Sequence, residues 1–278
     1  MSAYRFCRTD DIGLLVDALN RCWGPYFPNQ PPATPATFKR SIRDFQVWCS
    51  SCMVAFEGDA PIGVLIGAKR AAGTLVHRIA VHPDHRRQGH GRHLLTSLGS
   101  KLAILGPPRI LAEVPEMLAE ACALFSGCGY VEEAVLTDYV LQQDASDGHE
   151  GVGLLVIPVS VDDLAANGLL GEAHPQVCWE RSVETLTARK DEIAGLAVAS
   201  DEGIEAYVLF LIGGEIVALR SFVEDDGVRL KHLLTRRGSG TFRLPKAHPA
   251  EISKDLLDAL GFRATGTHLL YAARARAN

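Results

Sequence analysis

The sequence predicts a protein of two tandem α/β domains, and three observations lead to this prediction. The chain has 278 residues, which favours two domains because a typical domain has about 150 residues. Its apolar residues follow strand periodicity and helix periodicity in alternation along the chain. The second half repeats landmarks of the first half in the same order, which indicates a shortened second copy.

The first half begins with a predicted helix at 10–22, where apolar side chains recur at helical spacing after an Asp cap. Residues 23–38 are rich in Pro, Gly, Asn and aromatic side chains, which predicts an irregular loop. The other elements expected in this half are a hairpin of strands at 52–57 and 61–68, a strand at 74–81, a helix at 89–105, a strand at 109–114, a helix at 116–127 and a strand at 130–141.

The domain boundary is expected in the polar stretch DASDGHEG at 144–151, so the predicted domains are 1–146 and 147–278. In the second half, Leu260-Gly261-Phe262 repeats Cys128-Gly129-Tyr130 as a helix end that leads into a strand. The elements expected before this landmark are strands at 206–211 and 215–222 around a Gly-Gly turn, a helix at 227–236 and a strand at 241–245.

Composition and charge exclude several classes of protein. Apolar residues make up 47% and charged residues 22%, which excludes a disordered or coiled-coil chain. With 28 Lys and Arg against 33 Asp and Glu, the net charge of −5 argues against a nucleic-acid partner. The first residues lack the apolar core of a signal peptide, and the longest apolar stretch is too short for a membrane span. We therefore expect a cytoplasmic protein with no membrane partner.

Seven cysteines occur without regular spacing. Cys49 and Cys52 form a C-x-x-C pair, but no second pair follows to complete a zinc site. A redox pair is one interpretation, and two partly buried thiols are the interpretation that we favour.

The segment TLVHRIAVHPDHRRQGHGRHLL at 74–95 carries the most chemistry. A strand is followed by a loop with Pro, two Arg and two Gly, and then by an amphipathic helix. Glycines permit tight turns and close approach, while the first N–H groups of a helix and its dipole attract anions. Arg86 and Arg87 add positive charge that suits a pyrophosphate. The segment therefore predicts an anion-binding loop rather than a solvated surface turn.

Two better-known phosphate-binding motifs do not fit this loop. No Gly-Lys-Ser/Thr follows it, which excludes a Walker A loop. Leu94 stands where the dinucleotide fingerprint needs its third glycine. A nucleotide-binding enzyme is therefore disfavoured.

R-x-x-G-x-G at 86–91, with the preceding AV-H-P-D and the following R-x-L-L, resembles the acetyl-coenzyme A (acetyl-CoA) loop of the GNAT N-acetyltransferases. The later segment CALFSGCGYVEE is similar to the last helix and strand of that family. The resemblance covers about residues 4–142 and is specific around 79–95. It implies two GNAT-like domains, each with a mixed, mostly antiparallel sheet flanked by helices, and acetyl-CoA as co-substrate without a metal.

The resemblance also implies a set of cofactor-binding residues. The backbone of Ile79, Ala80 and Val81 is expected to bind the pantetheine arm and the thioester carbonyl, with the Val81 N–H as oxyanion donor. The residues expected to surround the pyrophosphate are Arg86, Arg87, Gln88, Gly89, His90 and Gly91.

The expected reaction is acetyl transfer to an amine, which must first lose a proton because an alkyl ammonium has a pKa near 10. His77 stands where family members often carry a carboxylate base, and the ordinary pKa of imidazole, near 6.5, suits that role. A strand histidine that faces a neighbouring helix is an equal alternative. Glu113 on the next strand is a second candidate base, although a surface strand Glu is the more common case.

Two positions depart from the family pattern. Phe125 stands where the family often has a general-acid Tyr, and Leu118 stands where it often has Asn. Phe125 cannot donate a proton, so another residue or water must do so. The consequence is limited because a thiol leaving group, with a pKa of about 8.5, departs as thiolate near neutral pH.

The other histidines of this segment do not predict a metal site. The spacings of His82, His85, His90 and His93 do not suggest a closed ligand set, although the last two share one helix face. We expect all four to be loop or helix-surface residues.

The second domain is expected not to bind coenzyme A. An acidic run, 224–226, stands where its anion loop would fall, and Leu257 replaces the Tyr of the family. The acceptor is expected to be a small-molecule or peptide amine beside the loop at 23–38. Trp23, Tyr26 and Phe27 would form an aromatic wall there or be buried in the core.

The function favoured by these observations is an acyl-CoA-dependent N-acyltransferase, with acetyl as the acyl group. The alternative is a non-catalytic acyl-CoA-binding sensor or scaffold, which the missing Tyr and the inactive second copy favour.

Overall fold

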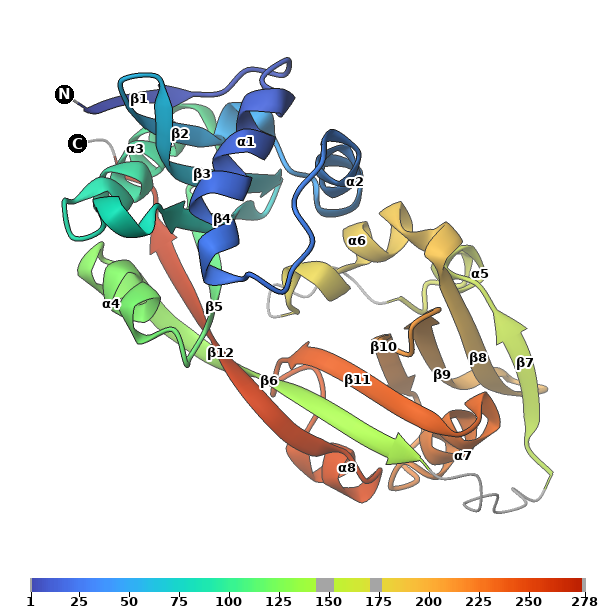
Figure 1. The fold of residues 1–278 in the computed structure, drawn as a ribbon. Coiled ribbons are helices and arrows are strands. Elements are labelled where there is room, and N and C mark those ends of the chain that lie inside the picture. The colour runs from blue at the N-terminus through green and yellow to red at the C-terminus, as the bar shows by residue number, and fades with distance from the viewer. Residues whose placement is uncertain (1, 144–152, 171–176, 277–278) are drawn as a thin grey trace. The chain divides into compact units, whose positions relative to one another are not determined.

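The structure is a computed structural model that describes residues 2–143, 153–170 and 177–276 (Figure 1). It divides into two compact units, Met1–Ala134 with Leu269–Asn278, and Val135–His268. The division predicted at 146/147 does not match these units, and the linker predicted at 144–151 lies outside the described residues. The chain passes between the units inside two long strands, β6 (Val131–Gln143) and β12 (Arg263–Arg274).

The first unit is a mixed sheet in the strand order β1-β2-β3-β4-β5-β12. β4 and β5 are parallel, while the pairs from β1 to β4 are antiparallel. The predicted helices and strands are confirmed with small shifts of their ends, and β1 and α2 are additional. The elements are β1 (Ser2–Phe6), α1 (Ile12–Cys22), α2 (Pro35–Phe45), β2 (Met53–Glu57), β3 (Ala60–Arg70), β4 (Gly73–Val81), α3 (His90–Leu105), β5 (Arg109–Pro115) and α4 (Ala119–Gly127).

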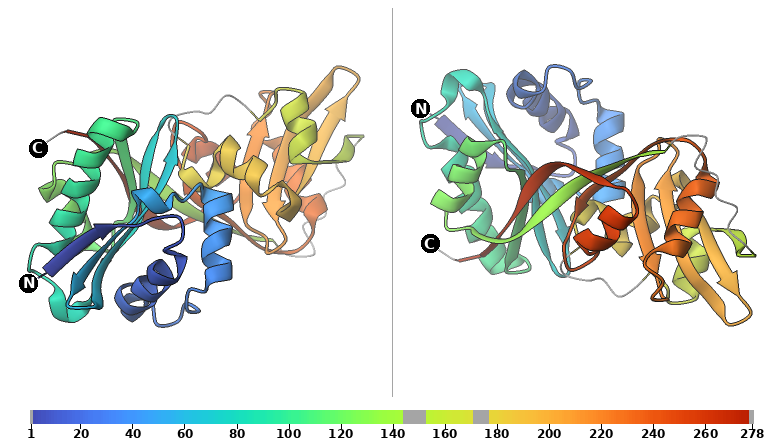
Figure 2. Two further views of the ribbon diagram at one scale, coloured as in Figure 1. Left: turned by 90° about the horizontal axis from the view of Figure 1, so that it is seen from above. Right: turned by 90° about the horizontal axis from the view of Figure 1, so that it is seen from below.

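Helices cover both faces of this sheet, α3 and α4 on one face and α1 and α2 on the other (Figure 2). Leu94, Leu98 and Leu102 form a helical stripe on α3 and pack with Phe125 of α4 against the strands. All four side chains are at most 2% exposed. This core fixes α3 on the sheet, and so it fixes the loop that precedes α3 relative to the end of β4.

The irregular loop predicted for 23–38 is wrong at its end, where α2 begins. The Thr34 hydroxyl accepts a hydrogen bond from the Thr37 N–H (3.1 Å), and the Thr37 hydroxyl accepts one from the Thr34 N–H (2.9 Å). This reciprocal cap, with Pro35 at the first helical position, starts the helix in spite of its loop-like composition. At its end, α2 brings Phe45 to the sheet, where its ring stacks on His77 of β4.

The second unit repeats the element order of the first. Each helix and strand from β1 to β6 has its counterpart in the same sequence position, so the second copy is complete rather than shortened. The elements before β12 are β7 (Leu155–Val159), α5 (Val161–Ala166), α6 (Val183–Ala188), β8 (Ile193–Ser200), β9 (Gly203–Leu211), β10 (Ile216–Ser221), α7 (Val228–Arg237), β11 (Gly240–Ala247) and α8 (Lys254–Ala259). The four strands β10-β9-β8-β7 form one antiparallel sheet.

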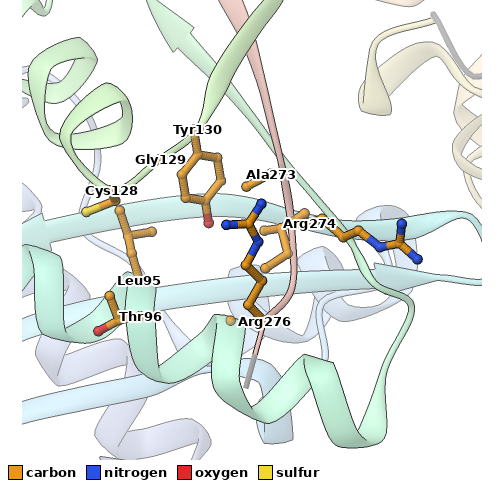
Figure 3. A pocket seen from close by; sticks show the side chains of 10 residues that line it. Leu95, Thr96, Cys128, Gly129, Tyr130, Ala273, Arg274 and Arg276 are labelled. Carbon is orange, nitrogen blue, oxygen red and sulfur yellow. The ribbon is translucent and has the colours of Figure 1, made fainter. Parts of the chain in front are cut away.

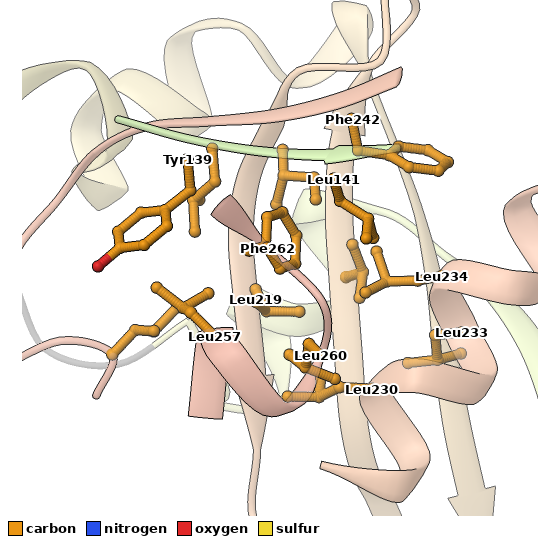
Figure 4. Packing of buried hydrophobic residues seen from close by; sticks show 14 of the residues in the cluster. Tyr139, Leu141, Leu219, Leu230, Leu233, Leu234, Phe242, Leu257, Leu260 and Phe262 are labelled. Atoms are coloured by element: carbon orange, nitrogen blue, oxygen red, sulfur yellow. The ribbon is translucent and has the colours of Figure 1, made fainter. Parts of the chain in front are cut away.

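The core of the second unit lies between its strands and the helices α7 and α8 (Figure 4). Leu230, Leu233 and Leu234 of α7 are at most 2% exposed, and Leu257 of α8 is fully buried. Phe262, directly before β12, packs against them. The Leu257 position therefore serves packing, as its apolar side chain predicts.

The repeated helix ends have the same geometry in both copies. Gly129 and Gly261 adopt positive φ angles of 83° and 88°. In each copy the next residue donates its N–H five residues back, from Tyr130 to the Phe125 carbonyl (3.1 Å) and from Phe262 to the Leu257 carbonyl (2.9 Å). This C-terminal motif needs glycine at the left-handed position, so it confirms the repeat that the sequence indicates.

The two copies exchange their last strands. Within the second unit, β11 pairs with the C-terminal part of β6, from Thr137 to Gln143. Within the first unit, the strand beside β5 is the C-terminal part of β12. Tyr271 of that part stacks on Phe125 with ring centroids 5.9 Å apart and lies in the core of the first unit. A cut at 146/147 would remove this side chain from the unit that it completes.

The cysteine pair behaves as predicted. Cys49 and Cys52 are thiols that are 6% and 0% exposed. Burial raises the pKa of both thiols, which makes the reactive thiolate rare at neutral pH.

Candidate cofactor-binding and catalytic site

The sheet of the first unit opens between β4 and β5. Their parallel ladder joins Thr74 to Ile110 and Leu75 to Leu111. Among the described residues, this ladder does not continue into the second half of β4. The two strands are therefore not joined by backbone hydrogen bonds where β4 approaches the predicted anion loop.

The backbone of β4 presents polar groups to this opening. The His82 N–H donates to the Ile62 carbonyl of β3 (2.8 Å). Because the backbone groups of an antiparallel strand alternate in direction, Ala80 also turns toward β3, while Ile79 and Val81 turn away from it. Of the three residues predicted to bind the pantetheine arm, Ile79 and Val81 have N–H groups directed at the gap, and Ala80 does not.

His77 lies at a β-bulge. The register with β3 pairs Ile66 with Arg78 and Gly67 with Val76, so His77 is an extra residue on β4. Its ring stacks on Phe45 at the end of α2, with centroids 5.4 Å apart. Bulges re-aim a side chain and are frequent beside active sites. Here the bulge places His77 on the face of the sheet that carries α2.

Glu113 reaches the same face by a different route. Ala112 and Val114 on either side of it are buried in the core beneath α3. Since side chains alternate along a strand, Glu113 points to the opposite face, which His77 shares. Both predicted bases are half-buried, and their side chains project from the neighbouring strands β4 and β5 to the same face of the sheet.

The loop before α3 makes a tight turn through two left-handed residues. Arg87 has a φ angle of 63°, and Gly89, which precedes the first turn of α3, has a φ angle of 87°. Gly89 has no side chain to cap the helix, so the first N–H groups of α3 are left for an external acceptor. The predicted tight turn at Gly89 is confirmed.

Gly91 has a packing role. A β-carbon at this position would lie 3.0 Å from a methyl group of Leu124 on α4. The glycine therefore allows α3 and α4 to approach closely at the end of the helix that faces the loop. A larger side chain would push α4 away from the loop.

Arg86 connects the loop to two other elements. Its guanidinium forms an ion pair with Glu120 in the first turn of α4 and lies 5.8 Å from the ring centroid of Tyr26. Arg87 and Gln88 are exposed beside it. The positive charge predicted for the loop is present, but Glu120 partly neutralises it.

Tyr26 is a site residue whose role the sequence does not predict. Its hydroxyl donates to the Val81 carbonyl (2.6 Å), which links the loop after α1 to the end of β4. Burial raises the pKa of Tyr26, so the hydroxyl stays protonated as a donor. Trp23 and Phe27 stack on each other at 4.5 Å and are partly exposed rather than buried in a core.

His90 is buried, and the prediction that it lies on the helix surface is wrong. It is 5% exposed, and its Nδ1 hydrogen-bonds the Tyr4 hydroxyl (2.7 Å). His93 contacts the same tyrosine ring, with centroids 3.7 Å apart. Both histidine side chains therefore hold β1 against α3. Because the His90 side chain faces Tyr4, only the backbone of His90 can contribute to an anion site at the loop.

Phe125 is a core residue. It is 2% exposed and meets the ring of Tyr130 edge to face with centroids 5.1 Å apart. Its ring has no group that could donate a proton, as the sequence predicts for this position. Leu118 lies just before α4 and is 36% exposed.

No cluster of three or more His, Cys, Asp or Glu that suits a metal ion occurs within residues 2–143, 153–170 and 177–276. In the same residues, no helix has the length and apolar character needed to cross a membrane.

A sequence model of the family described as an acetyltransferase (GNAT) domain matches residues 48–132, which contain the loop and both strands of the opening. The chain therefore contains a GNAT acetyltransferase domain. Curated relatives are the [ribosomal protein bS18]-alanine N-acetyltransferases of Escherichia coli (strain K12), 35% identical, and of Salmonella typhimurium, 34% identical, each over 83 residues. The match covers 30% of this chain and 54% of each relative, so the chain spans about half the length of the curated relatives it matches.

Solved structures show that the GNAT fold extends over both units. A tandem GNAT protein from the clavulanic acid biosynthesis pathway covers 99% of both chains with a TM-score of 0.66 and 18% identity. A GCN5-related N-acetyltransferase from Sphaerobacter thermophilus covers 99% of this chain and 96% of its own, with a TM-score of 0.67 and 16% identity. The tandem GNAT arrangement that the sequence resemblance implies is therefore confirmed.

Proposed function

We propose that this GNAT protein transfers an acetyl group from acetyl-CoA to a primary amine at the opening between β4 and β5. The observation that carries this proposal has two parts: the N–H groups of Ile79 and Val81 turn away from β3 toward the opening, and the residue before α3 has no side chain to cap the helix N-terminus. The strand would bind the pantetheine amides and the helix N-terminus the pyrophosphate. Residues 86–91 would form the wall of the phosphate site.

The proposed reaction is a direct attack of the acceptor amine on the thioester, and it needs one base and one hydrogen-bond donor from this chain. The lone pair of the acceptor amine attacks the thioester carbon, the C–S bond breaks, and the coenzyme leaves as a thiolate that needs no strong acid. A base on the protein takes the amine proton. His77 and Glu113 are our candidates because they lie on adjacent strands and face the same side. The Val81 N–H is the proposed donor to the carbonyl oxygen as negative charge develops.

The kind of amine that accepts the acetyl group is a second, separate proposal. The bS18-alanine relatives are named for an alanine acceptor, and an α-amino group has a pKa of about 8, so a larger fraction is deprotonated at neutral pH than of a lysine amine. We therefore propose peptides with an N-terminal alanine as the first acceptors to test, together with small primary amines.

The test is to measure acetyl-CoA binding by calorimetry and release of free coenzyme A with each acceptor, using the full chain. The full chain is needed because Leu269–Asn278 belong to the first unit. Saturable binding followed by acceptor-dependent release supports the transferase. Binding without release for every acceptor supports the sensor or scaffold instead, and no binding overturns the cofactor site.

The catalytic residues need a separate test. His77→Gln should lower kcat by about 100-fold or more if the imidazole is the base, with unchanged acetyl-CoA affinity and with loss of the acidic limb of the pH–rate profile. Glu113→Gln is the parallel variant for the second candidate. A pH–rate profile that stays unchanged in both variants would show that neither side chain takes the proton.

A further inference from the structure

A cavity of about 200 Å³ lies in the first unit, away from the proposed cofactor site. It is bounded by the middle of α3, the end of α4, the start of β5 and the last residues of the chain that the structure describes (Figure 3). Gly99 on its wall is ten residues beyond Gly89, which is about 15 Å along the helix axis. The cavity is therefore separate from the loop at 86–91.

One wall of the cavity is apolar, and the space beside it can hold the apolar part of a small ligand. Leu95, Gly99, Ile110 and Ala273 contribute it. A β-carbon placed on Gly99 would meet only the end of the Ile110 side chain, at 3.9 Å. A cavity of about 150 Å³ with apolar walls is sufficient to hold benzene.

The other wall is polar and positively charged. Tyr130 is 7% exposed, and its hydroxyl has no hydrogen-bond partner among the described residues. A buried hydroxyl without a partner is costly, so this group favours a ligand that accepts a hydrogen bond. Burial raises the pKa of Tyr130, which keeps the hydroxyl protonated as a donor.

Arg276 completes the polar wall. Arg274 and Arg276 both border the cavity, but the Arg274 side chain points away from it (Figure 3). Arg276 forms no ion pair with the part of the chain that the structure describes. In Figure 3 the side chains of Tyr130 and Arg276 approach each other from opposite sides of the cavity. A phenol and a guanidinium side by side match the two oxygens of a carboxylate.

We propose that this cavity is a second ligand site, which takes a small carboxylate with an apolar body about the size of benzoate. The ring or short alkyl chain would lie against Leu95 and Ile110, and the carboxylate would accept hydrogen bonds from Tyr130 and Arg276. The site does not depend on the proposed acetyl transfer, because none of these residues belongs to the cofactor loop or to the opening beside β4.

The test uses benzoate as the probe and benzamide, its neutral isostere, as the matched control. Calorimetry on the full chain should show saturable one-to-one binding of benzoate. Benzamide should bind about tenfold more weakly, because a charge-assisted hydrogen bond is lost. Tyr130→Phe should weaken benzoate about fivefold through loss of one hydrogen bond, and Arg276→Gln should weaken benzoate but not benzamide.

Gly99→Leu should fill the cavity and abolish binding, and Gly99→Ala is the milder variant if the leucine disturbs folding. Thermal unfolding followed by circular dichroism shows which variants remain folded. The proposal is overturned if benzoate does not bind, if benzamide binds equally well, or if Gly99→Leu is folded and still binds benzoate. Displacement of benzoate by acetyl-CoA would also overturn it, since the probe would then occupy the cofactor site.

Discussion

The N-termini of α3 and α7 occupy the same place in the two repeats, but they differ in what meets their N–H groups. Each helix follows a glycine with a left-handed φ angle, 87° at Gly89 and 79° at Gly227. At α7, one oxygen of the Asp225 carboxylate accepts from the Gly227 N–H (3.1 Å), and the other accepts from the Arg229 N–H (3.0 Å). At α3, basic side chains replace the acidic run and the cap glycine offers no acceptor.

The comparison shows how a repeat can keep its backbone and lose an anion site. Asp225 supplies from within the chain the negative charge that we propose α3 takes from a phosphate. Arg229 then holds this carboxylate with its own guanidinium (2.8 Å). The second copy therefore has the turn of an anion loop, and its acidic side chains, not its backbone, are what we propose to exclude coenzyme A.

The largest expected effect is on cofactor affinity. Gly91→Glu should weaken acetyl-CoA binding by about 100-fold or more, because a carboxylate beside the pyrophosphate costs several kcal/mol and its bulk meets Leu124. Val228→Glu, an exposed change at the start of α7, should leave the affinity unchanged. Calorimetric titration of each variant with acetyl-CoA measures the two affinities for comparison with that of the parent protein. Equal loss in both would show that the two helices do not differ as we propose.

The next effect is on stability. Asp225→Ala should lower the free energy of unfolding by about 1 kcal/mol, the usual cost of losing a helix N-terminal cap. Glu224→Ala is the matched control, because that side chain is exposed one residue away. Urea unfolding at neutral pH measures both. If Asp225→Ala is as stable as the control, the carboxylate does not hold the helix N-terminus in solution.

A smaller effect concerns pH. The hydrogen bond from Arg229 (2.6 Å) holds the pKa of Glu205 below its ordinary value. A lowered carboxyl pKa adds stability above the ordinary value, about 4.3, and this contribution is lost as the pH falls through the lowered pKa. The difference in urea midpoint between the parent and Glu205→Gln should thus be constant near neutral pH and shrink in acid. Glu202→Gln, exposed in the adjacent turn, should show no such trend.

The smallest effect concerns the thiols. Cys122 within α4 and Cys128 directly after its end are partly exposed, while the other five cysteines are buried. Burial raises the pKa of Cys7 to about 12 and that of Cys22 to about 11. Iodoacetamide at neutral pH should therefore modify two cysteines in the native chain, which intact-mass spectrometry counts. Rapid modification of Cys7 would contradict the packing of the first unit.

Local patterns predict most of the first repeat because its helices and strands have clear periodicity and several of them end at or next to Gly or Pro, as at Gly58, Gly106 and Pro115. They fail where the cause lies elsewhere in the molecule. His90 begins α3 directly after a polar, glycine-containing loop, yet it is buried and hydrogen-bonds Tyr4 of β1, which is distant in the sequence. The placement of Phe45 against His77 depends on a helix whose composition resembles a loop.

The exchange of β6 and β12 is the clearest case of information that a local pattern cannot carry. Each strand follows a helix that ends at a left-handed glycine, Gly129 before β6 and Gly261 before β12. This shared local signal does not say which of the two strands lies beside β5. The loop at 86–91, by contrast, is predicted well because one short segment contains the strand end, the turn and the helix start.

The position of Tyr271 has a consequence for biosynthesis. This ring completes the core around Phe125, but in the chain it follows the whole second unit. As the polypeptide emerges from the ribosome, the first unit cannot close its core until the second has been translated. The loop at 86–91 is thus made early and receives its final support only after the second unit has been translated, which ties the assembly of the two repeats together.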